Sequence, residues 1–205
     1  MASERPPAMF VGGAPALDFL NSTAMPVDTV VDWIEDGDGL VAWLGQSALV
    51  SEAELEALGE RTTPHQLDKI ARQARELREW FRRYVRDHMG RPLTSRSIDE
   101  LEPVNRVLEG DRACLQIVAG ADPQRPLELR KIRRWHAAES ILVPIAEAIA
   151  EFVCQQDFTD VKACEGAACT LLFADRTQRR GRRWCSMAVC GNRAKQALHR
   201  SRQRE

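Results

Sequence analysis

Four of the six cysteines stand in two pairs near the C-terminal end of the chain, and their spacing restricts the fold more than any other feature. Cys164 and Cys169 enclose four residues, Cys185 and Cys190 enclose four more, and fifteen residues separate the pairs. Four thiolates bind one Zn²⁺ in a tetrahedron when each pair lies in a tight turn that directs both sulfurs to one point. Four unrelated buried cysteines or two disulfides are the alternatives, and the matched spacings favour zinc.

The rest of the chain gives these cysteines their setting. Its 205 residues, 44% hydrophobic and 29% charged, can hold one medium domain and a small module. No run of about eighteen apolar residues predicts a membrane span, and the N-terminus lacks the apolar core of a secretory signal. We therefore expect a cytoplasmic protein. In a reducing compartment, paired cysteines bind metal more often than they form disulfides.

A zinc site of this kind would be structural. Roughly forty residues cannot build a sufficient core alone, so the metal would supply on the order of 10–16 kcal/mol of apparent binding free energy to folding. Four protein ligands leave no open position for a substrate or an activated water. The remaining chain has scattered histidines and no glycine-rich phosphate loop after a strand. We therefore expect no enzyme, and we expect Cys114 and Cys154 to be small buried side chains.

Charge is divided unevenly along the chain. From residue 160 to the end, eleven Lys and Arg stand against four Asp and Glu, a net +7. This leaves eighteen Lys and Arg against twenty-six Asp and Glu in residues 1–159, a net −8. An acidic body with a basic tail suggests that the tail meets a polyanion, usually nucleic acid.

The segment between the cysteine pairs predicts the rest of the small module. Thr170–Phe173 and Arg182–Trp184 are predicted as two strands around a turn, and residues from Met187 onward favour a helix. The order of cysteine turn, hairpin and helix is that of a treble-clef zinc finger. Five arginines cannot all be buried, and we expect them to project from the hairpin: Arg176, Arg179, Arg180, Arg182 and Arg183.

The preceding residues are predicted to form a mainly helical body, which makes the fold class mainly α (α+β). Capping residues and periodic apolar side chains predict helices that start at Asp36 or Asp38, Ser51, Thr63, about Ser95 and about Arg133. An apolar–turn–apolar pattern over residues 112–129 favours a small β-hairpin instead.

Three further expectations concern details of this body. Gly12, Gly13 and Pro15 argue against a regular helix near the N-terminus. Pro144 is expected to kink the last helix. Acidic residues separate the arginines of the helix at 63–90, so those arginines are expected on a solvated face.

Two stretches resemble known families. LLFADRTQRRGRRWCSMAVCGNRAK, residues 171–195, resembles the CGNR zinc finger, named for the tetrad that stands here at residues 190–193. Both cysteine spacings and the Arg-Arg-Trp-Cys-Ser-Met run agree across roughly residues 160–200. Upstream, GGAPALDFLNS at residues 12–22 resembles the opening of the ABATE domain, a family proposed to belong to stress-induced bacterial transcription regulators.

The resemblance implies a zinc-binding transcription regulator with an ABATE-like domain at residues 1–157 and a CGNR-type finger at residues 158–205. Asn192 would cap the helix or read a base edge, and Arg193 would brace the zinc site or contact phosphate. The finger would bind DNA mainly through its phosphates. The expected nucleic-acid contacts are Arg176, Arg179, Arg180, Arg182, Arg183, Asn192, Arg193, Lys195 and Arg200.

The body is expected to sense a small ligand or to form a homodimer. The alternative function is a zinc-stabilised module that binds protein or RNA without sequence-specific DNA binding.

Overall fold

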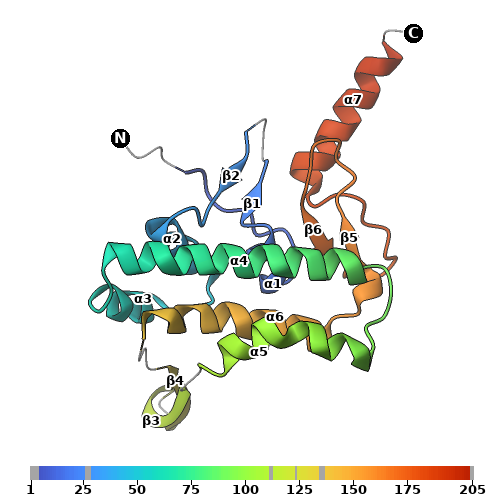
Figure 1. The fold of residues 1–205 in the computed structure, drawn as a ribbon. Helices are drawn as coiled ribbons and strands as arrows, with labels where there is room; N and C mark the ends of the chain where they lie inside the picture. The colour runs from blue at the N-terminus through green and yellow to red at the C-terminus, as the bar shows by residue number, and fades with distance from the viewer. Residues whose placement is uncertain (1–4, 26–28, 111–112, 123, 134–136, 204–205) are drawn as a thin grey trace.

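A computed structural model of the chain describes residues 5–25, 29–110, 113–122, 124–133 and 137–203. It shows a helical body with short hairpins and a C-terminal segment built around the four cysteines, which confirms the predicted fold class (Figure 1). The α-helices are α1 (Pro15–Leu20), α2 (Gly37–Ser47), α3 (Glu52–Gly59), α4 (Pro64–His88), α5 (Glu102–Leu108), α6 (Val143–Gln155) and α7 (Asn192–Arg202). The strands are β1 (Thr23–Ala24), β2 (Val31–Asp32), β3 (Ala113–Asp122), β4 (Arg125–Arg133), β5 (Val161–Ala163) and β6 (Leu172–Ala174). Short 3₁₀ turns occupy Ser95–Leu101, Ala138–Leu142 and Phe158–Asp160, and a π turn occupies Met187–Gly191.

Local capping starts three of the body helices where the sequence predicts. The Asp36 carboxylate accepts a hydrogen bond from the Gly39 N–H, 2.7 Å away, at the start of α2. Ser51 and Glu54 form a reciprocal capping box on α3, and Thr63 forms one on α4, where Pro64 takes the first position. These predicted helix starts are confirmed.

α1 is a helix that the sequence analysis did not expect. The proline at its start does not prevent a helix, because the first helical position needs no N–H donor. Leu17, Phe19 and Leu20 of α1 are fully buried. α1 contacts α4, α6 and β6, so it lies at the centre of the body.

Aromatic side chains join the two long helices of the body. Phe81 of α4 meets Phe152 of α6 edge-on, with ring centroids 6.1 Å apart. The ring centroid of Phe158, just beyond α6, lies 5.3 Å from that of Phe152 and 6.1 Å from that of Tyr84. The core thus continues from the helices to the start of the cysteine-containing segment.

The segment between α5 and α6 confirms one prediction and corrects another. β3 and β4 pair as an antiparallel hairpin, as the pattern at residues 112–129 indicates. The last helix does not begin near Arg133, because β4 runs to that residue and α6 begins only at Val143. Pro144 therefore lies in the first turn of α6, where it starts the helix instead of kinking it.

Two arginines of α4 are buried, which corrects the expectation of a solvated arginine face. The Arg78 guanidinium donates to both carboxylate oxygens of Asp32, each at 2.8 Å, and to the Ser22 hydroxyl. Arg82 donates to the Leu20 carbonyl. Burial raises the pKa of Asp32, but the hydrogen bonds and charge of Arg78 outweigh it, and the net shift is downward. These arginines fasten β2 and α1 to α4.

Within the part of the chain that the structure describes, none of the helices combines the length and apolar character needed to cross a bilayer.

Candidate zinc centre and basic surface

The four predicted cysteine ligands meet at one point. Their sulfurs all lie within 4.8 Å of one another, with 3.8 Å between Cys169 and Cys185 and 3.6 Å between Cys185 and Cys190. A zinc ion with four sulfurs at 2.3 Å in a tetrahedron sets those sulfurs about 3.8 Å apart. The cluster therefore has the chemistry and the dimensions of one structural zinc site.

The first cysteine pair lies in the turn of a hairpin that differs from the predicted one. β6 pairs with β5, on the other side of Cys164 and Cys169, and not with Arg182–Trp184. The latter segment forms no strand in the described structure because its backbone is engaged elsewhere. The Arg182 N–H donates to the Asp175 carboxylate, and the Arg183 carbonyl accepts from the Glu165 N–H.

The second pair is brought together by a π turn. The Gly191 N–H donates to the Ser186 carbonyl at 3.0 Å, five residues earlier, and α7 follows directly. In a turn closed by a hydrogen bond between residues five apart, side chains five residues apart lie on the same side. The π turn therefore places Cys190 next to Cys185. The helix predicted after the second pair is present, but its first turn is wider than an α-helical turn.

Hydrogen bonds within the cluster concentrate negative charge on one sulfur. The Cys185 thiol and the Leu171 N–H donate to Cys169 and lower its pKa to about 5. Burial raises the pKa of Cys190 to about 12, and hydrogen bonding to Cys169 raises the pKa of Cys185 above its ordinary range. Without a cation, hydrogen bonding and burial therefore favour negative charge on Cys169 over Cys185 and Cys190. A divalent cation at the centre of the cluster is needed to stabilise four thiolates.

Asp175 organises the loop between the two cysteine pairs. Its fully buried carboxylate accepts from Lys162 Nζ at 2.8 Å, from the Thr177 hydroxyl at 2.6 Å and from the N–H groups of Thr177 and Arg182. Burial raises its pKa, yet the hydrogen bonds from these donors outweigh burial and hold the pKa well below the ordinary aspartate value. The sequence analysis did not single out this residue.

Arg182 is half-buried, whereas the other predicted DNA contacts are exposed. Its guanidinium donates to the carbonyls of Val11, at 2.9 Å, Trp184, at 3.0 Å, and Cys185. It also lies 4.2 Å from the centre of the Phe173 ring. The side chain therefore braces the backbone at a zinc ligand through Nε and Nη2, and its predicted phosphate contact stays a prediction.

The N-terminal motif holds β6 against the body. The buried Asn21 side chain donates to the Leu172 carbonyl at 2.8 Å and accepts from the Leu172 N–H at 3.0 Å. The Gly12 carbonyl accepts from the Ala174 N–H. Gly13 has φ of +78°, and a Cβ there would lie 3.1 Å from the Ala174 carbonyl oxygen. The glycines and the asparagine of GGAPALDFLNS therefore all contact β6, a strand of the cysteine-containing segment.

One hydrophobic core therefore runs through both parts of the chain. It includes Phe19 and Ile149 of the body together with Leu172, Phe173 and the cysteine Cys185. The division between residues 157 and 158 stays a prediction.

The remaining residues predicted to contact nucleic acid are exposed. They are Arg176, Arg179, Arg180, Arg183, Asn192, Arg193, Lys195 and Arg200. Some of them already have partners, since Arg180 pairs with Asp160 and Arg183 with Glu165. The Asn192 amide donates to the Ala188 carbonyl at 3.2 Å, a contact within the start of its own helix.

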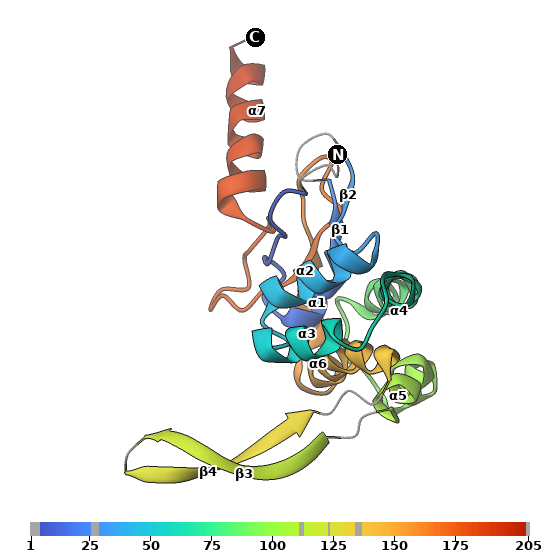
Figure 2. The same cartoon turned by 90° about the vertical axis from the view of Figure 1, so that its left-hand side faces the viewer.

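α7 extends away from the body, as Figures 1 and 2 both show. Arg193, Lys195 and Arg200 of this helix are exposed, and so is Arg179 on the loop before it. A projecting helix with cationic side chains can approach a large anionic surface that the compact body could not reach.

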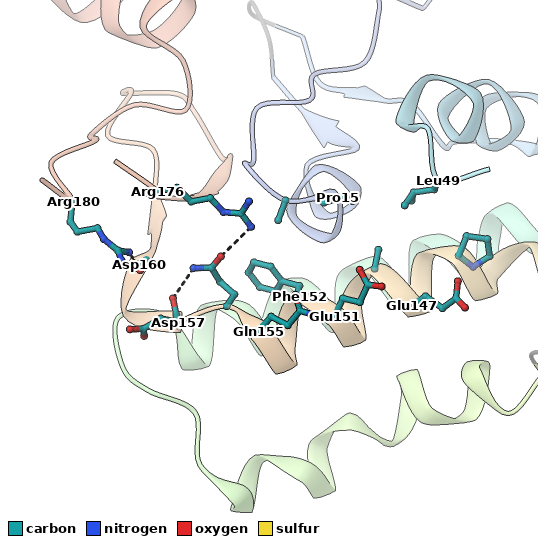
Figure 3. Close-up of a pocket in the computed structure, with 14 residues that line it drawn as sticks. Pro15, Leu49, Glu147, Glu151, Phe152, Gln155, Asp157, Asp160, Arg176 and Arg180 are labelled. Atoms are coloured by element: carbon teal, nitrogen blue, oxygen red, sulfur yellow. Dashed lines mark hydrogen bonds and ion pairs between the residues drawn. The ribbon is translucent and has the colours of Figure 1, made fainter. Parts of the chain in front are cut away.

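A cleft of about 570 Å³ lies between α6 and the loop that carries Arg176 and Arg180 (Figure 3). One face of α6 forms its wall, with carboxylates at Glu147 and Glu151 and an apolar surface at Phe152. Opposite, Arg176 donates to the Gln156 side chain at 3.4 Å and Arg180 pairs with Asp160. Figure 3 shows both arginines on this side of the cleft. Leu49 and Pro15 complete the apolar lining.

Cys154 differs from its prediction. It is exposed near the end of α6 and lies outside the four-sulfur cluster. Cys154 lies next to the buried face of α6 but is not part of that face. The Cys114 side chain lies outside the described residues.

Two family models match the chain. The ABATE model, described as "putative stress-induced transcription regulator", matches residues 13–156. The CGNR zinc finger model matches residues 161–203. No curated protein matches the chain.

Proposed function

Because the chain belongs to the ABATE family and carries a CGNR zinc finger, we propose that it is a transcription regulator whose zinc-stabilised finger binds DNA. The main support is the set of exposed cations on α7 and on the loop before it, next to a cluster of four cysteines that can supply all four ligands of one zinc ion. Four protein ligands leave the metal no open position, which supports a structural ion and a protein without a catalytic step.

Phosphate contacts would supply most of the affinity. The exposed cations of the predicted set can each release a counterion from DNA, Arg180 and Arg183 by exchanging their carboxylate partners for phosphate. They are Arg176, Arg179, Arg180, Arg183, Arg193, Lys195 and Arg200. With six to ten such contacts, the affinity for a duplex falls about 10³- to 10⁵-fold between 50 and 200 mM salt. Fluorescence anisotropy of the zinc-loaded protein with a mixed-sequence duplex measures this fall. Binding that hardly responds to salt contradicts the proposal.

A triple variant tests which cations are used. Replacing Arg179, Lys195 and Arg200 with alanine is expected to lower the slope of log affinity against log salt by about 2.7, since each phosphate contact contributes about 0.9. Zinc content stays unchanged, because none of the three touches a ligand. The matched control replaces Arg72 and Arg83, two exposed arginines of α4, and should leave the slope as it is.

The same titration separates the second candidate function. A structured RNA that binds more tightly than the duplex, with a similar salt dependence, supports an RNA-binding module. Absence of binding to both nucleic acids supports a finger that docks on protein.

We further propose that the cleft beside α6 is the ligand-sensing site of the regulator. Its volume is that of an ordinary small-molecule site, and it combines an apolar lining with charged groups at the rim. A bound molecule would touch Arg176 and Arg180, whose loop leads to Cys185. A bound molecule would therefore shift the loop that carries Arg176 and Arg180, and with it the basic surface.

Narrowing the cleft tests this site. Ala148 lines it, and Ala148→Phe is expected to remove most of the small molecule that co-purifies with the chain, measured by native mass spectrometry. Ala167→Phe, at an exposed position in the first cysteine turn, is the control and retains the molecule. A wild-type protein that carries no small molecule, or equal retention in both variants, contradicts the assignment.

A further inference from the structure

A second cavity lies on the finger itself, and the described residues that line it are all different from those of the cleft beside α6. It has a volume of about 570 Å³ and lies between the loop that joins the two cysteine pairs and the start of the π turn. This cavity is called here the finger hollow. Its lining includes Arg179, Arg183, Trp184 and Met187.

The lining of the finger hollow combines positive charge with aromatic and soft apolar groups. Arg179 and Arg183 are exposed arginines, and among the described residues that line the hollow none is acidic. Such a lining repels cations and attracts anions, while Trp184 and Met187 offer contacts to an apolar or aromatic group. A flat aromatic base joined to a phosphate has both properties, so the chemistry of the hollow fits a nucleotide.

Arg183 presents a flat group on which a base can stack. Its Cζ atom lies over the Trp184 ring, 4.9 Å from the ring centre, and Trp184 packs in turn against the core. The Glu165 carboxylate accepts from the Arg183 Nε at 2.7 Å and pairs with its Nη2 at 2.6 Å. The guanidinium is therefore held in place while 61% of the side chain stays exposed.

Stacking would use a different part of the guanidinium from the ion pair. Unpaired bases stack on the planes of arginine guanidinium groups as well as on aromatic rings. The N–H groups lie at the edge of that plane, where they bind a carboxylate or a phosphate. Arg183 can therefore stack on a base and keep a charged partner at the same time.

Met187 adds a half-exposed apolar side chain to the finger hollow. A Cβ on Gly191 would lie 2.7 Å from the Met187 Sδ atom, so the methionine rests against this glycine of the CGNR tetrad. A thioether sulfur makes favourable contacts with aromatic rings. Met187 would gain such contacts when a base enters the hollow.

We propose that the finger hollow binds one unpaired base of DNA. The proposal rests on the proposed function, because the cations of the finger would hold the phosphates on either side of that base. In an intact duplex the faces of each base are covered by its neighbours. The hollow therefore takes a base from a single strand, a bulge or a nucleotide turned out of the stack.

The preference for an unpaired base tests the proposal. Fluorescence anisotropy of the full zinc-loaded chain compares a perfect duplex with the same duplex that carries one extra, unpaired adenine. Stacking of one base on a protein side chain strengthens binding by roughly 10- to 100-fold. The duplex with the unpaired adenine is expected to bind more tightly by this ratio.

Arg183→Lys separates stacking from charge, because lysine keeps the positive charge and lacks the flat guanidinium. A weaker phosphate contact affects both DNAs alike and cancels in the ratio of their affinities. The ratio is expected to fall about 5-fold or more. Met187→Ala, which changes no charge, is expected to lower the ratio as well. Arg83→Lys, the same substitution at an exposed position of α4, is the matched control and keeps the wild-type ratio.

A free nucleotide offers the same base and phosphate and tests whether DNA is the source. Deoxyadenosine monophosphate lacks the neighbouring phosphates, so it is expected to displace the duplex with the unpaired adenine only in the millimolar range. Displacement in the micromolar range would instead assign the finger hollow to a small nucleotide and overturn the proposal.

The outcomes on DNA distinguish this site from DNA binding in general. Equal affinity for the two duplexes, with steep salt dependence, overturns the stacking site and leaves the proposed function in place. A wild-type ratio in both Arg183→Lys and Met187→Ala places the unpaired base elsewhere on the chain and overturns the assignment. Absence of binding to either duplex contradicts the proposed function and the stacking site together.

Discussion

Cys185→Ser is expected to bring the zinc content from one ion per chain close to zero. Changes to groups that only orient a zinc ligand cost about 10- to 100-fold in metal affinity, so loss of a ligand costs more. The serine hydroxyl stays protonated at neutral pH, and three sulfurs would leave the ion with an open position. Metal analysis of the purified protein after dialysis measures the result.

Loss of zinc is also expected to destabilise the helical body. Zinc in small modules contributes on the order of 10–16 kcal/mol of apparent binding free energy. Leu172 and Phe173 lie in the same core as Phe19, so release of the metal removes support from α1 as well as from the cysteine turns. We expect most of the helical circular dichroism signal to remain, with a lower midpoint of thermal unfolding.

Cys154→Ser is the matched control for this prediction. Cys154 is exposed and lies outside the cluster, so its replacement should leave one zinc per chain. Full zinc content in Cys185→Ser, or loss of zinc in Cys154→Ser, would show that the ligand set is wrong.

Asp175→Ala is expected to lower the free energy of unfolding by about 3 kcal/mol, because it removes a fully buried carboxylate and each buried group left without a partner costs about 1–3 kcal/mol. The substitution leaves Lys162 without its carboxylate and leaves the N–H groups of Thr177 and Arg182 without their acceptor. Urea unfolding of the zinc-loaded protein measures the loss. Asp157→Ala is the control, because this exposed carboxylate accepts from the Thr159 N–H in a surface turn and its replacement should lower the free energy of unfolding far less.

The pH dependence of Asp175 follows from its lowered pKa. A carboxyl group whose pKa is lower in the folded state stabilises the fold above its unfolded pKa, and this contribution is lost as the pH falls. The difference in unfolding free energy between wild type and Asp175→Asn should therefore be greatest at neutral pH. It should narrow as the pH falls below about 4, the ordinary aspartate pKa. A difference that widens in acid would contradict a stabilising, ionised Asp175.

Local signals in the sequence predicted much of this fold. The caps at Ser51 and Thr63 depend on residues three positions away, and the cysteine spacing depends on two short turns. Such features are decided within one element and can be found in a single sequence. The zinc site was predictable for the same reason.

The contacts that were missed join distant parts of the chain. The Asn21 side chain reaches a backbone 151 residues away, and the register of β6 depends on Val161–Ala163. Arg78 and Arg82 lie among other arginines of α4, and only their packing against distant segments, such as Arg78 against Asp32, distinguishes them from the exposed ones. The one available signal for Asn21 was a polar residue directly after the apolar pair Phe19–Leu20.

The hydrogen bonds between Asn21 and Leu172 limit how the body and the finger can be recombined with other domains in evolution. The asparagine takes the place of a neighbouring strand, so β6 is completed by the first part of the chain. A finger transferred to an unrelated body would present an unmatched backbone N–H and carbonyl at this edge. Body and finger are therefore expected to be inherited as a matched pair, with changes near Asn21 accompanied by changes around β6.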